Sequence, residues 1–117
     1  MASTQDFAEY VIDSVSLEKV KVRKMFGDFA FYFEEKVVGF ICDNIFFLKI
    51  TENSTKILQE ENIELEQKSA YPGSRNFYVA SEELLENRKF LQKIIFGIWQ
   101  DVGNKTKNKK FEQSKKK

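Results

Sequence analysis

The spacing of apolar residues changes along the chain from a helical period to a twofold period and back. Near the N-terminus, apolar side chains recur three or four residues apart, which predicts a helix that begins after Ser3 or Thr4 and ends near Ser14. Asp6 lies in its first turn, where a carboxylate favours the positive end of the helix dipole. The inward face of this helix is expected to hold Phe7, Tyr10, Val11, Ser14 and Val15.

From Val20 onwards apolar and other residues alternate, which is typical of strands. Val20 and Val22 occupy even positions, whereas the three phenylalanines in 29–33 occupy odd positions, so the apolar face changes sides between the two runs. Gly27 lies at this change, and glycine tolerates the positive φ that a bulge or tight bend needs. We therefore expect a kink or turn at Gly27 instead of one flat strand.

Two further apolar runs, 37–42 and 45–50, follow the aromatic run and are separated from it and from each other by short polar turns. This pattern predicts an antiparallel meander. The run 45–50 has apolar side chains on both of its faces. We expect this strand either to be covered on each side or to meet a partner through its second face.

The second half of the chain returns to a helical period after two more strands. The predicted elements are a connecting helix from Asn53 or Ser54 to about Glu61, a charged edge strand at 63–68, a turn at 71–74, a strand at 76–80 and a helical region from Ser81 to Val102. This helical region could divide at Asn87–Arg88. With 20–33 counted as one bent strand, the predicted fold class is α+β in the order α-β-β-β-α-β-β-α. Its antiparallel sheet is packed by helices in two layers.

Length and composition indicate one globular domain. The 117 residues are 42% hydrophobic and include twelve phenylalanines, which is enough apolar volume for a single core. Residues 105–117 hold seven lysines and one glutamate, a net charge of +6, whereas residues 1–104 carry a net charge of −5. We therefore predict a folded domain at 1–104 and a disordered lysine-rich tail at 105–117.

The single cysteine, Cys42, cannot form an intramolecular disulfide, and its apolar neighbours indicate a buried thiol in a reducing compartment. The N-terminal residues lack the basic and apolar regions of a secretory signal. No apolar run approaches the ~20 residues of a membrane span. The expected location is the cytoplasm, without insertion into a membrane.

Little in the composition supports catalysis. The chain has no histidine, which excludes the usual catalytic triads and most zinc sites and leaves Cys42 without an imidazole base. The five glycines are too scattered for a phosphate-binding loop. Paired glutamates at 34–35, 60–61 and 82–83 are interpreted as surface charge. We expect no catalytic residue, metal or cofactor. A pocket between helix and sheet that holds a carboxylate base is the enzymatic alternative.

Two features of the sequence suggest nucleic-acid binding as a function. The aromatic run 27–33 partly mimics the strand on which RNA-recognition modules stack bases, but Asp28 precedes its first phenylalanine and the order of elements differs, so we assign these rings to a core or an interface. The tail could contact phosphates, helped by Arg23 and Lys24, or could be a solvated terminus. Its candidate contacts are Lys105, Lys107, Lys109, Lys110, Lys115, Lys116 and Lys117.

Several stretches together resemble the TfoX N-terminal domain family, known from the Sxy/TfoX competence regulators. They are 22–27 with the aromatic run after it, 37–42, 45–50 and 77–84, and the resemblance covers roughly 7–102. Its most specific part is an Arg-x-Met-Phe-Gly motif, formed here by Arg23, Met25, Phe26 and Gly27. The resemblance implies an α+β domain with an antiparallel sheet, often a dimer, and a non-enzymatic role in regulating bacterial gene expression for DNA uptake. The family motif has no assigned catalytic role, so the resemblance implies no catalytic role for these residues.

The sequence therefore predicts a non-enzymatic regulatory or adaptor domain that acts through protein–protein interaction. We expect a homodimer formed through the second apolar face of the meander, because aromatic residues are in excess on both strand faces and reactive groups are few. The sequence does not identify any protein partner other than a second copy of the chain. The alternative function is nucleic-acid binding through the basic C-terminal tail.

Overall fold

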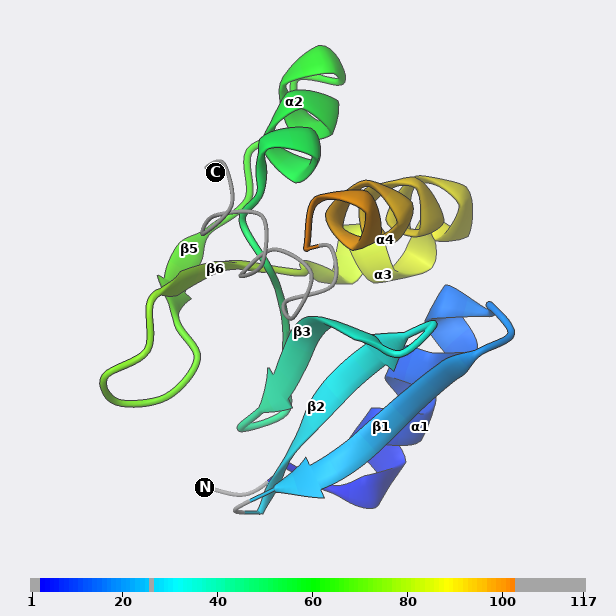
Figure 1. Ribbon diagram of the computed structural model, residues 1–117, viewed down its shortest axis with the longest axis vertical. Helices are drawn as coiled ribbons and strands as arrows, with labels where there is room; N and C mark the ends of the chain where they lie inside the picture. The colour runs from blue at the N-terminus through cyan, green and yellow to red at the C-terminus, as the bar shows by residue number, and fades with distance from the viewer. Residues whose placement is uncertain (1–2, 26, 103–117) are drawn as a thin grey trace, which may run out of the picture.

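A computed structural model describes residues 3–25 and 27–102 of the chain. Within them, a six-stranded antiparallel sheet with strand order β1-β2-β3-β4-β6-β5 is packed by four helices (Figure 1). The elements are α1 Gln5–Val15, β1 Val20–Met25, β2 Asp28–Phe33, β3 Lys36–Cys42, β4 Ile45–Leu48, α2 Glu52–Glu60, β5 Gln67–Ser69, β6 Asn76–Val79, α3 Glu82–Glu86 and α4 Arg88–Val102. The predicted α+β class, with an antiparallel sheet packed by helices, is confirmed.

The change of phase at Gly27 is a turn between two strands. Met25 pairs with Asp28 across it, and Gly27 has a φ of 85°, in the left-handed region that favours glycine. Because an even-numbered residue of β1 pairs with an odd-numbered residue of β2, Val22 and Phe31 lie opposite each other and point to the same face. The segment 20–33 therefore forms two antiparallel strands, where the predicted order counted one bent strand.

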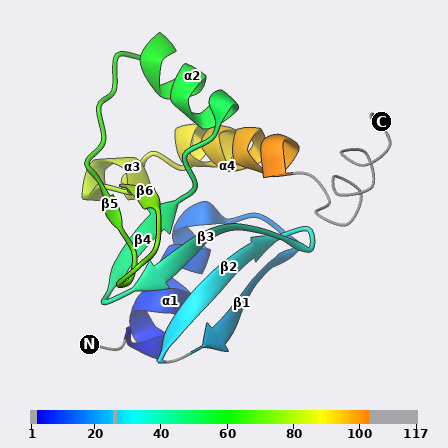
Figure 2. The same ribbon diagram turned by 60° about the vertical axis from the view of Figure 1, so that its left-hand side comes forward.

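The next two hairpins have two-residue turns without glycine. Glu34 and Glu35 have φ values of 47° and 71°, and Asp43 and Asn44 have values of 53° and 57°. Positive φ at both central residues is the signature of the type I′ turn, which matches the twist of the flanking strands. As a result, β2, β3 and β4 follow one another across the sheet, and Figure 2 shows β1 to β4 side by side with α1 behind them.

The main core lies between the sheet and the helices. Phe31 and Phe46 are fully buried at its centre, with ring centroids 4.9 Å apart. Every helix contributes to the core. The buried helical side chains are Ala8, Val11 and Val15 from α1, Leu58 from α2, Leu84 and Leu85 from α3, and Leu91, Ile94, Ile95 and Ile98 from α4. One face of the sheet and all four helices thus make the two predicted layers.

Some helix details differ from the sequence-based expectation. Tyr10 was predicted to face inwards but is 43% exposed, because the buried stripe of α1 contains Ala8 in its place. The cap of α2 is Thr51, earlier than predicted, in a capping box in which Thr51 and Ser54 bond each other's backbone N–H groups. The terminal helical region does divide, and Asn87 is the C-cap of α3.

The predicted edge strand at 63–68 is mostly not a strand. Gln67–Ser69 pairs with β6, and the Glu66 carbonyl accepts from the Val79 N–H at 2.8 Å, whereas Ile63 and Leu65 lie in non-strand chain and pack against the main core. Their alternation with glutamates therefore reflects packing against the core and not strand pairing. No helix within the described parts of the chain has the length and hydropathy to cross a membrane.

Candidate interaction surface on the helix-free face of the sheet

The sheet carries a second hydrophobic cluster on the face turned away from the main core. Phe47 alternates with Phe46 and Leu48, which belong to the main core, so its side chain points to the other face. The residues of this outer cluster are Cys42, Phe47 and Phe77, which are buried, and Phe40, Ile45, Ala70 and Val79, which are partly buried around them. Within the described residues, no helix contributes a side chain to the outer cluster.

Three phenylalanines of the outer cluster and the neighbouring Tyr71 pack edge to face. Phe77 contacts Phe40 and Phe47 with ring centroids 5.5 and 6.3 Å apart, and Tyr71 lies 6.1 Å from Phe40. Phe47 and Phe77 are only 2% and 3% exposed, but Tyr71 is 44% exposed. The centre of the outer cluster is therefore closed by its neighbours, and the accessible apolar surface lies at its rim.

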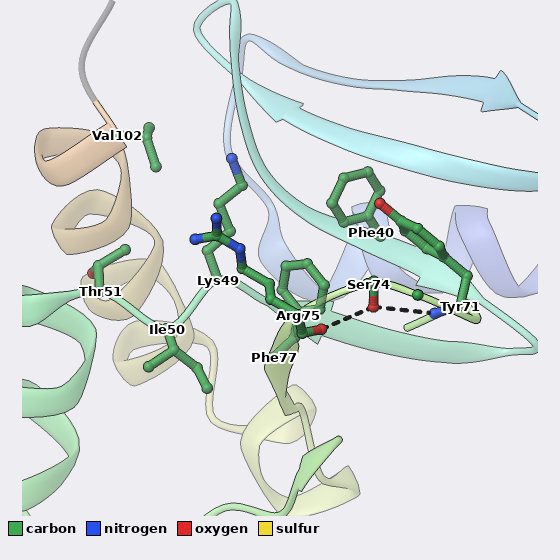
Figure 3. A pocket seen from close by; sticks show the side chains of 10 residues that line it. Phe40, Lys49, Ile50, Thr51, Tyr71, Ser74, Arg75, Phe77 and Val102 are labelled. Carbon is green, nitrogen blue, oxygen red and sulfur yellow. Dashed lines mark hydrogen bonds between the residues drawn. The ribbon is translucent and has the colours of Figure 1, made fainter. Parts of the chain in front are cut away.

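A groove of about 620 Å³ opens beside the outer cluster. It lies near the end of β4, which pairs with β6 at Phe47 and Leu48; the Lys49 N–H still donates to the Val38 carbonyl of β3 at 3.1 Å before the chain continues to α2. The lining residues are Phe40, Lys49, Ile50, Thr51, Tyr71, Gly73, Ser74, Arg75, Phe77 and Val102 (Figure 3). The groove thus lies between β3, the β5–β6 loop and the last residue of α4.

The β5–β6 loop is held in one shape by a turn and by a serine hydroxyl. Gly73 follows Pro72 and has a φ of 87°, and the Ser74 N–H donates to the Tyr71 carbonyl at 3.0 Å, as in a type II turn. The Ser74 hydroxyl accepts from the Ala70 N–H at 3.0 Å and donates to the Arg75 carbonyl at 2.8 Å. These bonds set the backbone from which Tyr71 and Arg75 extend.

Two of the described residues that line the groove are cationic. Lys49 and Arg75 both line it, and none of its ten described lining residues is acidic. Figure 3 shows the two cationic side chains extending towards the same part of the groove, on the side of Val102. The aromatic side chains of Phe40 and Tyr71 form a separate part of the wall, so one end of the groove is cationic and the other is apolar.

The residues of the Arg-x-Met-Phe-Gly motif lie at the β1–β2 hairpin. Arg23 pairs with Ala30, Ala30 with Phe40, and Phe40 with Phe47, so Arg23 stands on the outer face in line with the outer cluster. Met25 has Asp28 as its cross-strand partner, next to Gly27 in the turn. Phe26 lies outside the described residues, as do the seven tail lysines predicted to contact nucleic acid. The structure brings Arg23, Met25 and Gly27 to one hairpin and does not place them in the groove.

Asp28 organises a polar contact that sequence reasoning missed. Its Oδ1 atom accepts from the Ser3 N–H at 3.0 Å, the Ser3 hydroxyl at 3.0 Å and the Asp43 N–H at 3.1 Å. The Asn44 N–H donates to the Ser3 hydroxyl at 2.9 Å. The start of α1 and two hairpin turns are thereby tied together. The sequence does show an aspartate directly after a turn glycine. Its hydrogen-bond partners, however, are distant in sequence, so the contact could not be predicted from neighbouring residues.

The Cys42 thiol is not an activated nucleophile. Burial, and to a smaller extent the nearby carboxylates of Asp28 and Asp43, together raise its pKa from 9.0 to about 11. A thiol with such a pKa is protonated at neutral pH and is a weak nucleophile and a weak metal ligand. In the described parts of the chain, no three Cys, Asp or Glu side chains are grouped as a metal site would need.

The carboxylate pairs occupy turns and helix ends. Glu34 and Glu35 form the β2–β3 turn, 60–61 lie at the end of α2, and 82–83 lie in the first turn of α3. Two smaller hollows each include one glutamate, Glu64 or Glu83, and both residues are exposed. The arrangement offers binding surfaces, and the main groove contains no described carboxylate that could act as a base.

Fold and site together define a small α+β domain with a bare, aromatic sheet face. The model of the TfoX N-terminal domain family matches residues 14–97, so the protein belongs to this family, as the motif at 23–27 indicated. It is similar to an uncharacterized 12.7 kDa protein from the trpE 5' region of Spirochaeta aurantia, with 37% identity over 91 residues. The aligned region is 77% of this chain and 76% of that protein. Family membership supports a regulatory-domain kind of role.

Proposed function

We propose that the protein is a non-enzymatic regulatory domain of the cytoplasm that acts by binding another protein through the outer cluster. The observation that carries this proposal is an apolar, aromatic sheet face that no described helix covers. Such a face is costly to leave in water, and aromatic side chains are enriched at protein interfaces. The proposed process is regulation of bacterial gene expression, the role implied by the resemblance to competence regulators.

A second copy of the chain is the proposed partner on this face. Half-buried Phe40, Ile45 and Val79 form its apolar rim, while the strand register puts Arg23 and Asp28 on the same face, which gives it charges of both signs. A twofold interface places one patch against itself, so a patch that holds both signs suits it better than a patch of one sign. The homodimer would bury the rim that the monomer leaves accessible.

Sedimentation velocity over a range of protein concentrations tests the homodimer. The natural sequence is expected to dimerise, and Val79→Lys is expected to remain monomeric with an unchanged circular dichroism spectrum. Tyr10→Lys is the matched control, because Tyr10 is 43% exposed on α1, away from the outer cluster, and its loss should leave the dimer intact. A natural sequence that stays monomeric at the highest concentration would contradict the homodimer.

Nucleic-acid binding through the tail is the second candidate function. Its support is the net charge of +6 in residues 105–117, together with the position of Arg23 on the outer face. Each phosphate contact made by a lysine would make binding weaken with salt. A gel-shift titration of the whole chain and of residues 1–104 tests it. Binding at low salt that survives removal of the tail, or no binding by the whole chain, would remove the tail from this role.

A further inference from the structure

We propose that the free edge of β1 binds an extended segment of a partner protein in which acidic and apolar residues alternate. The segment would pair with β1 in antiparallel orientation, like the other strand pairs of the sheet, and main-chain hydrogen bonds would hold it there. The outer cluster lies on β3, β4 and β6 and in the β5–β6 loop, so the edge of β1 is a separate surface. This inference therefore goes beyond the proposed function.

The two edge strands of the sheet differ in length. In the strand order β1-β2-β3-β4-β6-β5, the described edges are β1 and β5 (Figure 1). Every residue of β1, Val20–Met25, pairs with β2, whereas β5 consists of only three residues, Gln67–Ser69. A short edge has few unpaired backbone groups, but a longer regular edge is a template for another strand. An added strand therefore suits β1 better than β5.

Alternate residues of β1 point their backbone groups away from the sheet. Just beyond the end of β1, the Glu34 N–H donates to the Lys19 carbonyl at 3.0 Å. Because hydrogen-bonded pairs alternate along an antiparallel ladder, the odd-numbered residues of β1 are those that bond to β2. The N–H and C=O groups of Val20, Val22 and Lys24 thus face the free edge, and no other described backbone segment bonds to them. These groups are available to an added strand.

The side chains of β1 differ between its two faces. Val20 and Val22 point inwards and pack against the main core, but both are only half-buried, whereas Phe31 opposite Val22 is fully buried. Lys21 and Arg23 point to the outer face and are exposed. An added strand would place every second side chain beside the valines, where an apolar residue suits. Its other side chains would lie beside Lys21 and Arg23.

The cations of β1 disfavour a second copy of the chain as the added strand. If two copies of β1 paired with Val22 at the centre, Lys21 of one would lie opposite Arg23 of the other. Pairing centred on Lys21 or on Arg23 would place that residue opposite itself. Like charges directly opposite each other destabilise a sheet, and cations on edge strands are a common protection against self-pairing.

An acidic strand gains from the same cations, because opposite charges across a strand pair are stabilising. Lys21 already contacts Glu35 at 3.5 Å, but the two side chains are 70% and 83% exposed, so this ion pair contributes little and competes weakly. The tail is an unsuitable occupant, since residues 105–117 carry a net charge of +6. A nucleic acid has no backbone N–H and C=O groups to pair with the edge. The observations therefore favour an acidic, extended protein segment.

Fluorescence anisotropy with labelled ten-residue peptides tests this proposal on the full chain. The main probe alternates glutamate and valine. A second peptide groups the same residues in two blocks, so it has the same net charge and measures attraction by charge alone. A third peptide replaces each glutamate by lysine, and a ten-nucleotide single-stranded DNA is a further probe. The alternating acidic peptide is expected to bind at least tenfold more tightly than each of these three.

Backbone methylation of the peptide tests the strand pairing itself. In the proposed antiparallel pair, the valines of the alternating peptide lie beside Val20 and Val22 and donate their N–H groups to β1. N-methylation of the valines should therefore weaken binding at least tenfold. N-methylation of the glutamates blocks the opposite edge of the peptide and should change its affinity by less than about twofold.

Variants at exposed positions locate the binding site. Lys24→Pro removes an N–H that faces the free edge without breaking a bond to β2, and should weaken binding of the alternating acidic peptide at least fivefold. Lys24→Thr loses the same charge but keeps the N–H, so its affinity should stay within about twofold. Arg23→Glu should weaken binding at least tenfold, whereas Lys93→Glu, at an exposed position of α4, should have no effect. Thermal melting of each variant verifies that the domain is folded.

Several outcomes would overturn the proposal. Absence of peptide binding, or a valine-methylated peptide that binds as well as the glutamate-methylated one, would exclude strand pairing. Full binding by both Lys24→Pro and Arg23→Glu would assign the peptide to another surface, such as the tail lysines. Tighter binding of the DNA that is lost in Arg23→Glu would assign the edge of β1 to nucleic acid.

Val79→Lys separates this inference from the homodimer. Because β2, β3 and β4 lie between β1 and β6, the substitution should abolish the dimer and leave the affinity for the alternating acidic peptide unchanged. A natural sequence that is monomeric but binds the peptide would contradict the homodimer alone. A dimer that does not bind the peptide would contradict the inference about β1 alone.

Discussion

The two faces of the sheet are both apolar, but they are covered in different ways. On the inner face, Phe31 and Phe46 are completely buried beneath four helices. On the outer face, Phe47 and Phe77 are nearly as buried, at 2% and 3% exposed, yet their cover is a ring of neighbouring side chains and one loop. Low exposure therefore does not distinguish a deep core from a thin layer. The thin layer leaves an accessible rim at which a partner can bind.

Adjacent phenylalanines of β4 allow the sharpest test of this comparison. Phe46→Ala should lower the free energy of unfolding by about 4 kcal/mol, because the cavity lies in a close-packed core. Phe47→Ala should lower it by about 2 kcal/mol, since loops and water can close around a shallow site. Urea denaturation of both variants measures the difference. Equal losses would show that the outer cluster is as deeply packed as the main core.

Asp28 links the two faces at one end of the sheet. Asp28→Ala removes the acceptor of three hydrogen bonds and should lower the free energy of unfolding by about 2 kcal/mol. Asp13→Ala is the control, because Asp13 is exposed on α1 and should change stability by less than about 0.5 kcal/mol. If urea denaturation gave the same small effect for both, the Asp28 contacts would not tie α1 to the hairpins.

Substitutions in the β2–β3 turn, at the other end of the sheet, should increase the stability of the domain. Glu34 and Glu35 adopt φ values of 47° and 71°, which non-glycine residues adopt at a cost. The double variant Glu34→Asn, Glu35→Gly keeps the type I′ turn with residues that prefer it and should raise the melting temperature, with a gain of about 1 kcal/mol. Loss of stability would show that the glutamate side chains make contacts more important than the turn strain.

The reactivity of the Cys42 thiol measures how well the outer cluster is shielded from solvent. Its pKa of about 11 against 9.0 predicts that the folded chain reacts with iodoacetamide at pH 8 at least about 100-fold more slowly than the urea-unfolded chain. The folded state keeps its proton where the unfolded state has lost it, so stability should fall as the pH rises from about 9 to 11. Cys42→Ala should remove this part of the pH dependence. Rapid alkylation of the folded chain would mean that the outer layer opens readily.

Local sequence signals predicted much of the fold for identifiable reasons. The period of two at 20–50 and the turn residues between the runs predicted the meander, because strand faces and turn φ values depend on neighbouring residues. The predicted inward position of Tyr10 was wrong, since helix rotation is decided by the surface against which α1 packs. The alternation at 63–66 was misread because packing against a core produces the same pattern as strand pairing.

The candidate site was less predictable than the fold. A partner-facing second side of 45–50 was an open alternative in the sequence, and the structure shows an outer cluster without helical cover. The groove could not be predicted, because its lining residues come from segments that are far apart in the chain. Arg23 was singled out by its motif, but its alignment with Phe40 and Phe47 required the registers of three strand pairs.

The sequence by itself determined the α+β class, a kink or turn at Gly27, the motif that identifies the family and the scarcity of catalytic side chains. These features depend on residue type, on spacing within a few positions and on turn geometry. Only the tertiary structure decided which sheet face the helices cover, how Asp28 joins Ser3 to a second hairpin, and which residues line the groove. Those features depend on contacts between segments far apart in the chain, and burial and strand register settle them only when the whole domain packs.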